Sequence, residues 1–224
     1  MKNYNIKSLF LILVATSTMI FTGCKKDLQP SKATFWPVIE LKGAPTVVIT
    51  VGDTYEDAGA EVTVNGAPID FETVSTVDNT TEGVYSVLYS AENEDGISAS
   101  QERVVVVVPA DAIDVPAVVG NFVLTTPSRP SPIPTMKVSS LGNHVYYSTN
   151  IYGSNGNNVL LIFPAYMYTT DGSTFNILSG PFVSGGNYSD GGAASWNEAT
   201  GKLAAAFLLP VAPGTTFSRT WTKN

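Results

Sequence analysis

The side chains that most often perform catalysis are scarce in this chain of 224 residues, which contains one histidine, His144, and one cysteine, Cys24. Nucleophilic catalysis needs a nucleophile beside a base, and no serine here stands in a GxSxG turn. His144 lies in a strand-like stretch beside Val145, and we interpret it as an ordinary strand residue. One histidine and one cysteine are too few for a zinc site. The sequence therefore predicts a protein that is not an enzyme and uses no metal or cofactor.

Paired carboxylates are the remaining catalytic candidates, because two acids roughly 5 to 10 Å apart can hydrolyse a glycosidic bond. Four glutamates lie in or beside expected strands: Glu40, Glu61, Glu72 and Glu198. None belongs to a recognisable pair flanked by aromatic residues. We interpret them as parts of solvated strand faces.

Two acid-rich segments, GDTYED (52–57) and AENEDG (91–96), contain oxygen ligands of the kind that calcium prefers. If the segments met at one end of a β-sandwich, the ligands would be Asp53, Asp57, Glu92 and Asp95. The spacing does not match an EF-hand loop, because Gly96 falls at the wrong offset. We therefore expect turn carboxylates that face water.

The aromatic residues of the C-terminal half favour another chemistry, the binding of sugars, whose flat C–H faces stack on rings while their hydroxyl groups bond to amides and carboxylates. The GGNYSDGG segment (185–192) has little neighbouring apolar sequence to bury Tyr188, and Trp196 follows shortly after. We predict that these two rings form a stacking platform, although each could instead lie in a core. The predicted ligand-binding residues are Tyr152, Asn187, Tyr188, Asp190 and Trp196.

Strand alternation limits which tyrosines can be exposed, because successive side chains point to opposite faces. Tyr146 and Tyr147 must therefore face opposite ways, and Tyr166 and Tyr168 share one face, with Met167 on the other. We therefore expect at least one member of the pair Tyr146 and Tyr147 to face outward or to line a groove.

The first residues read as a targeting segment. Lys2 and Lys7 precede an apolar run (9–21) that is too short to span a bilayer comfortably. The Gly23-Cys24 step that follows resembles the lipobox of bacterial lipoproteins, although Phe21 replaces the usual small or Leu-like residue. The resemblance implies that residues 1–23 are a cleaved signal peptide, that Cys24 is lipidated, and that 24–37 is a tether. The alternative is ordinary export with a free or buried cysteine.

Charge and cysteine content restrict the partners of the exported chain. Loss of residues 1–23 removes two of the 12 basic residues and none of the 19 acidic ones, so the formal charge falls from −7 to −9. An acidic surface argues against binding nucleic acid. A single cysteine allows no disulfide within the chain, so stability must come from packed cores.

Residues 38–110 have the pattern of an Ig-like β-sandwich, with short strands separated by turn signals. The segment 101–108 (QERVVVVV) predicts a strand that is buried on both faces or docked against a neighbour. VGDTYEDAGAEV (51–62) and VDNTTEGVYSVLYSAENEDGISASQERVVVV (77–107) resemble the bacterial surface Ig-like domain. Tyr85 stands where a tyrosine can hydrogen-bond back across the corner that Gly83 permits.

Residues 111–117 read as a linker, and residues 118–224 as a second antiparallel β-domain, either a meander barrel or a sandwich. Its expected strands are 118–125, 135–140, 143–151, 159–168, 174–179, 193–197, 203–209 and 216–222. GNFVLT (120–125), VYYSTNIYG (145–153) and ASWNEATGKLAAAF (194–207) resemble the C-terminal β-domain of Bacteroidetes lipoproteins that accompany starch-utilisation-type glycan-uptake systems.

These patterns together predict an all-β, non-catalytic lipoprotein. The resemblance implies a lipid anchor in the outer membrane facing the cell exterior, a polysaccharide or oligosaccharide ligand, and a neighbouring outer-membrane transporter complex as partner. The alternative function is a structural or adhesive subunit that docks on a protein partner through a strand edge or an exposed aromatic patch.

Overall fold

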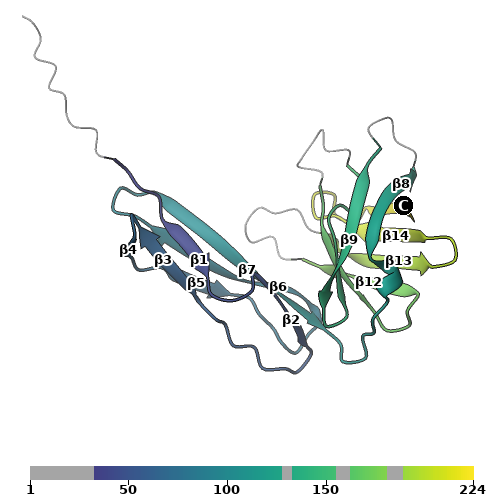
Figure 1. Ribbon diagram of the computed structural model, residues 1–224, viewed down its shortest axis with the longest axis horizontal. Coiled ribbons are helices and arrows are strands. Elements are labelled where there is room, and N and C mark those ends of the chain that lie inside the picture. The colour runs from purple at the N-terminus through teal and green to yellow at the C-terminus, as the bar shows by residue number, and fades with distance from the viewer. Residues whose placement is uncertain (1–32, 128–132, 155–161, 181–188) are drawn as a thin grey trace, which may run out of the picture. The chain divides into compact units, whose positions relative to one another are not determined.

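The structure is a computed structural model that describes residues 33–127, 133–154, 162–180 and 189–224. Phe35–Asn224 form one compact unit. This unit contains two sheets in a sandwich, made by β1–β7, and a closed barrel made by β8–β15 (Figure 1). The prediction of an all-β fold, with an Ig-like sandwich followed by a second antiparallel β-domain, is confirmed.

The Ig-like sandwich consists of one three-stranded and one four-stranded sheet, in the orders β1-β3-β4 and β2-β7-β6-β5. β2 pairs with β7 in parallel, and the other pairs are antiparallel. The long strands β6 and β7 run along the domain (Figure 1). The strands are β1 (Val38–Leu41), β2 (Thr46–Thr50), β3 (Ala60–Val64), β4 (Ala67–Pro68), β5 (Glu72–Ser75), β6 (Gly83–Glu92) and β7 (Ser98–Val108).

The valine run of β7 is buried on both faces, as predicted. Val105 and Val107 join Val87 and Tyr89 in the core between the two sheets. Val104, Val106 and Val108 point to the other face of the sheet and are buried there as well. The outer face of this sheet therefore packs against another part of the protein.

The predicted tyrosine corner is present. The Tyr85 hydroxyl donates to the backbone oxygen of Thr81 at 2.9 Å. Gly83 makes room for the ring, because a Cβ atom at that position would lie 3.3 Å from three atoms of Tyr85. This bond fixes the turn that leads into β6.

The second domain is an eight-stranded meander barrel. Each strand pairs antiparallel with the next, and β15 pairs with β8 to close the ring. Its core contains large rings, among them Phe122, Phe175, Phe207 and Trp221. The strands are β8 (Gly120–Thr126), β9 (Thr135–Gly142), β10 (Val145–Ser148), β11 (Ala165–Thr169), β12 (Thr174–Ser179), β13 (Asp190–Asn197), β14 (Lys202–Leu208) and β15 (Thr216–Lys223).

The barrel tyrosines alternate as expected. Tyr146 and Met167 lie in the barrel core, whereas Tyr147, Tyr166 and Tyr168 lie on the outer wall. The outer-wall tyrosines form a hydrophobic cluster with the outward-facing valines of the Ig-like sheet, which we call the contact cluster. Its buried members are Val84, Val104, Val106, Val108, Ala112, Val145, Tyr166, Tyr168 and Leu178.

Hydrogen bonds accompany the contact cluster. The Tyr168 hydroxyl donates to Glu82, and the Asn143 side chain donates to the Val48 carbonyl at 3.2 Å. In the connection between the domains, the Ile113 amide donates to the Thr169 carbonyl at 2.8 Å. A short 3-10 turn, η2 (Pro116–Val118), precedes the barrel.

The expectation that His144 lies within a strand is wrong. Asn143 and His144 have φ values of 44° and 64° and form the turn between β9 and β10. His144 Nδ1 lies 3.2 Å from Asp114 Oδ1, and both side chains are exposed. The pair of left-handed residues is what a tight hairpin requires, and an Asn-His pair is a weaker turn signal than Asn-Gly.

Candidate functional site

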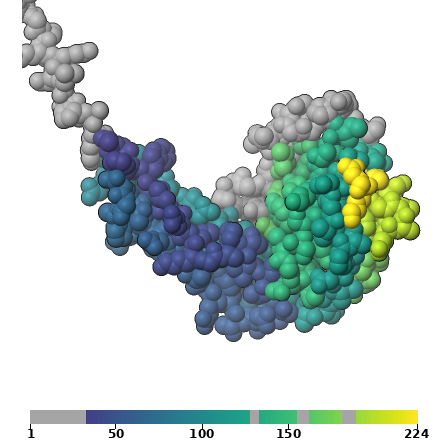
Figure 2. Space-filling model, viewed as in Figure 1, coloured from purple at the N-terminus to yellow at the C-terminus, as the bar shows by residue number. Residues whose placement is uncertain are grey.

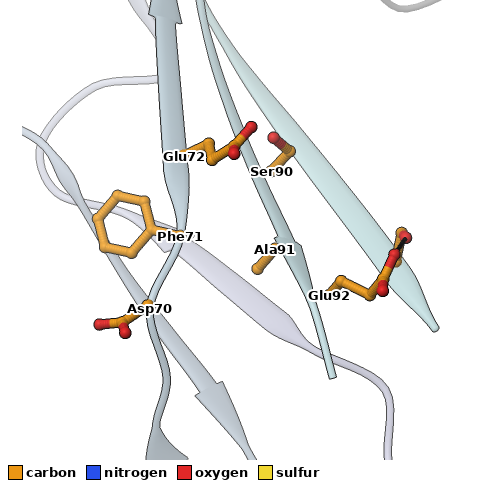
Figure 3. Close-up of a pocket in the computed structure, with 7 residues that line it drawn as sticks. Asp70, Phe71, Glu72, Ser90, Ala91 and Glu92 are labelled. Carbon is orange, nitrogen blue, oxygen red and sulfur yellow. Dashed lines mark hydrogen bonds between the residues drawn. The ribbon is translucent and has the colours of Figure 1, made fainter. Parts of the chain in front are cut away.

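An open cleft with a volume of about 440 Å³ lies at the β5 edge of the Ig-like domain (Figure 3). We call it the tip cleft. It is lined by Asp70, Phe71, Glu72, Ser90, Ala91, Glu92 and Ser98.

The pairing of β5, β6 and β7 positions the polar side of the tip cleft. Glu72 lies opposite Ser90, and Glu92 lies opposite Ser98, so these four residues share one face of the sheet. The Ser98 hydroxyl donates to Glu92 Oε2 at 3.0 Å. The cleft therefore carries two carboxylates and two hydroxyl groups on one face.

Phe71 gives the tip cleft an apolar side. Figure 3 shows Phe71 and Glu72 on opposite sides of the chain at β5. The Phe71 ring is 40% exposed and lies 6.2 Å from the Tyr89 ring, centroid to centroid. A ring that is held from below and open above can stack with a ligand.

None of the described residues that line the tip cleft is a histidine or a cysteine. Among the residues that the structure describes, no three His, Cys, Asp or Glu side chains are grouped so that they could hold a metal ion. Carboxylates and hydroxyl groups accept hydrogen bonds, so the cleft suits a ligand with donor groups and an apolar face.

A second cavity, of about 370 Å³, lies between β2 and the segment around Tyr55, and Arg103 is part of its wall. The Arg103 side chain is 1% exposed and forms an ion pair with Asp57. It also donates to three backbone oxygens, those of Lys42, Ala44 and Gly59, the last two at 3.2 and 3.1 Å. Arg103 thereby fastens two loops to β7.

Two tyrosines complete the network around Asp57. The Tyr55 hydroxyl donates to Asp57 Oδ1 at 2.8 Å, and Tyr89 donates to Oδ2. Burial opposes ionisation of Asp57, but hydrogen bonds from Tyr89, Tyr55, the Gly59 amide and Arg103 outweigh it and hold the pKa of Asp57 below its ordinary value. Burial and the bond to Asp57 raise the pKa of Tyr55 to about 12.

The calcium ligands considered from the sequence do not converge. Asp53 caps the end of β2 through the Thr50 amide, beside Val108, while Glu92 lies beside Ser98. These positions are at opposite ends of β7, whose 11 residues span about 35 Å at 3.3 Å per residue. Asp57 is taken up by its ion pair with Arg103. The idea that these acids meet at one end of the sandwich is wrong.

Trp196 does not form an exposed platform. In β13, Ala194 and Trp196 face the barrel core, and Trp196 is 7% exposed. Its ring packs edge to face on Phe122, with centroids 6.0 Å apart. The prediction of a surface stacking role for Trp196 is therefore wrong, because alternation gives the two faces of a strand but not which face is enclosed.

The other predicted ligand-binding residues are dispersed. Tyr152 is half-buried against the barrel core, and the Arg219 guanidinium lies 4.6 Å from its ring centroid. Asp190 is exposed and accepts from the Ser179 hydroxyl at 2.9 Å. Asn187, Tyr188 and the lipidation candidate Cys24 lie outside the described residues.

Sequence reasoning missed most of the tip cleft. Asp70-Phe71-Glu72 places one apolar residue between two acids, which is a weak local signal. The cleft depends on the register that sets β5 beside Ser90 and Glu92 of β6, and that register is not readable from one segment.

The fold defines a two-domain all-β protein, an Ig-like sandwich followed by a meander barrel. Residues 39–107 match the family described as "Bacterial surface protein, Ig-like domain", so the first domain is an Ig-like domain of the bacterial surface type. No curated protein matches the chain. Among solved structures, a lipoprotein from Bacteroides thetaiotaomicron is similar at 20% identity, over 84% of this chain and 100% of that one, with a TM-score of 0.43. Within the described ranges, the fold contains no helix with the length and apolarity needed to span a membrane.

Proposed function

We propose that this chain is a non-catalytic lipoprotein of the bacterial surface, anchored in the outer membrane through Cys24, and that its Ig-like domain is a spacer that holds the barrel away from the membrane. The family match of residues 39–107 supports a surface location. The Gly23-Cys24 step supports the anchor.

The observation that carries the spacer role is where the chain enters and leaves the Ig-like domain. Phe35 enters beside the β6–β7 turn, because its carbonyl accepts from the Asn93 side chain at 2.7 Å. The chain leaves after Val108, at the other end of β7. Entry and exit are therefore separated by the length of β7, about 35 Å.

The contact cluster supports the same role, because a spacer must be packed against the barrel in order to hold it at a distance from the membrane. Val106 is fully buried and Tyr168 is 3% exposed, although both lie on outer faces of their own domains. The Tyr168 bond to Glu82 adds a polar contact in the same region.

A second candidate function is carbohydrate capture by the barrel for a glycan-uptake complex in the outer membrane. The half-buried Tyr152 favours it, because part of this residue remains accessible to solvent and an accessible aromatic ring can stack on a sugar ring. The exposed carboxylate of Asp190 could accept a sugar hydroxyl.

The anchor is tested by expressing the full chain and a Cys24→Ala variant in a bacterium with a lipoprotein pathway. We expect the wild type in the outer-membrane fraction, with acyl chains detected by mass spectrometry on its first residue. The variant should be recovered without lipid and outside the membrane. A Cys24→Ala chain that stays in the membrane fraction would contradict the anchor.

Carbohydrate capture is tested separately by affinity electrophoresis of residues 24–224 through gels that contain single polysaccharides. Retardation by one glycan that is lost in Tyr152→Ala, but kept in a Val211→Ala control at an exposed position, would support it. If no glycan retards the wild type, the docking of a protein partner becomes the better account of the barrel.

A further inference from the structure

Four large apolar side chains are exposed on the Ig-like domain near the point where the chain enters it. Phe35, Trp36, Val38 and Phe71 are 46%, 66%, 51% and 40% exposed, and we call them the tip patch. The first residues of the Ig-like domain, purple in Figure 2, lie at its surface. Phe35 is fixed there by its bond to Asn93. Phe71 belongs to the tip cleft at the same end of β6.

We propose that the tip patch rests on the lipid bilayer that carries Cys24, with the rings of Trp36 and Phe35 in the headgroup region. This inference depends on the lipid anchor of the proposed function. Trp is the residue most typical of the boundary between lipid and water, where its apolar ring and its polar N–H are both accommodated. An exposed Trp beside an exposed Phe is costly in water, and burial in lipid removes that cost.

The tether is short enough to keep the tip patch close to the membrane. Ten residues lie between Cys24 and Phe35, and the eleven steps along the chain span at most about 38 Å when it is fully extended. A lipidated Cys24 therefore keeps the tip patch at a high local concentration beside the membrane surface.

The carboxylates next to the patch limit the depth of insertion and the kind of lipid. Asp70, Glu72 and Glu92 line the tip cleft beside Phe71. Charged groups remain in water, so only the rings enter the membrane. Negative charge at this end also favours headgroups that carry an ammonium group with no net charge, and disfavours anionic lipids.

The tryptophans of the chain allow a direct test. Trp196 and Trp221 are 7% and 0% exposed inside the barrel, so Trp36 is the tryptophan that quenchers reach. The chain starting at Cys24 is coupled through its thiol to a maleimide lipid in phosphatidylcholine vesicles with brominated acyl chains. We expect bromine to reduce the Trp36 emission, the emission to shift to the blue, and iodide quenching to fall relative to uncoupled protein. Adding phosphatidylglycerol should weaken all three changes.

Two variants provide the controls. Trp36→Phe should abolish the changes, because only the barrel tryptophans remain. Trp36→Phe combined with Val211→Trp moves the exposed tryptophan to the barrel, where Val211 is 58% exposed. This probe should stay fully accessible to iodide and should not be quenched by bromine.

Two outcomes would overturn the proposal. One is a Trp36 that remains as accessible to iodide after coupling as before it. The other is a Trp36 that is already protected without vesicles in a concentration-dependent way, which would assign the patch to a second copy of the chain. Because the lipid is attached chemically, the result is independent of whether cells lipidate Cys24, so a failure of the anchor and a failure of membrane contact are separate results.

Discussion

Replacement of Arg103 by alanine should destabilise the Ig-like domain severely and leave the barrel folded. The guanidinium is buried, pairs with Asp57 and donates to the backbone oxygens of Lys42, Ala44 and Gly59. Removing one member of a buried ion pair typically costs about 3 to 5 kcal/mol. Asp57 retains 25% exposure, and water can solvate it once Arg103 is gone, so we expect the lower end, about 3 kcal/mol.

Amide hydrogen exchange measured by mass spectrometry can test this value one strand at a time. A loss of about 3 kcal/mol should speed exchange in β3 and β7 roughly 100-fold where exchange follows opening of the domain. Peptides from β13 and β14 should exchange nearly as in the wild type. Lys42→Ala is the matched control, because it removes an exposed positive charge near the same site but keeps the carbonyl that Arg103 binds.

The reasoning about Arg103 would be refuted by either of two results. The first is an Arg103→Ala variant whose exchange in β7 changes no more than that of Lys42→Ala, which would mean that the network contributes nothing beyond surface charge. Alternatively, Arg103→Lys could be as stable as the wild type. A lysine keeps the charge but not the fork of donors, and it cannot reach three carbonyls at once.

Three further predictions concern the same domain and its contact with the barrel. The pKa of Asp57 in the folded protein lies below its ordinary value of 3.8. The stability that ionised Asp57 contributes is therefore complete above pH 3.8 and is lost as the pH falls through the folded pKa. The urea midpoint of the wild type should drop in acid, and that of Asp57→Asn should drop less. Tyr85→Phe removes the bond to Thr81 and should lower the free energy of unfolding by about 1 kcal/mol, and an unchanged urea midpoint would contradict this. Val106→Asp puts a charge into the contact cluster, so elastase, which cuts after small residues, should cleave residues 109–117 (PADAIDVPA) faster while the core of each domain stays resistant. Equal rates of cleavage would show that the cluster does not hold the barrel.

The elements of the fold were readable because they are local. Alternation in 145–148 places Tyr146 and Tyr147 on opposite faces, and clusters of Gly, Asn, Asp and Pro separate the eight barrel strands. Closure of the barrel was not readable, because it depends on β15 pairing with β8, where Trp221 meets Leu124 almost a hundred residues earlier. A pattern in one strand carries no information about a partner at that distance.

The sequence-based predictions of site residues were wrong for the same reason: they lacked information on distant partners. The predicted stacking platform includes Trp196 because it follows Tyr188 closely in the sequence, yet closure of the barrel places the Trp196 face of β13 inside the ring. From the sequence Asp57 is a candidate calcium ligand, but in the structure it forms an ion pair with Arg103, which lies 46 positions away. The tip cleft needs the register of β5 on β6, and no short motif encodes it.

The residues that make the Ig-like segment recognisable in the sequence form contacts that stabilise the fold. Asp57 binds Arg103, Tyr85 closes its corner on Thr81, and the valines of β7 fill two cores. Side chains with such partners cannot be removed without loss of stability, so variants at these positions report on folding rather than function. Trp36 is different, because it is 66% exposed and its replacement should cost the fold little. Phe71 is 40% exposed but also packs on Tyr89. A binding function of this domain is therefore best tested first with variants of Trp36, where a loss of binding would not be confounded by a loss of structure.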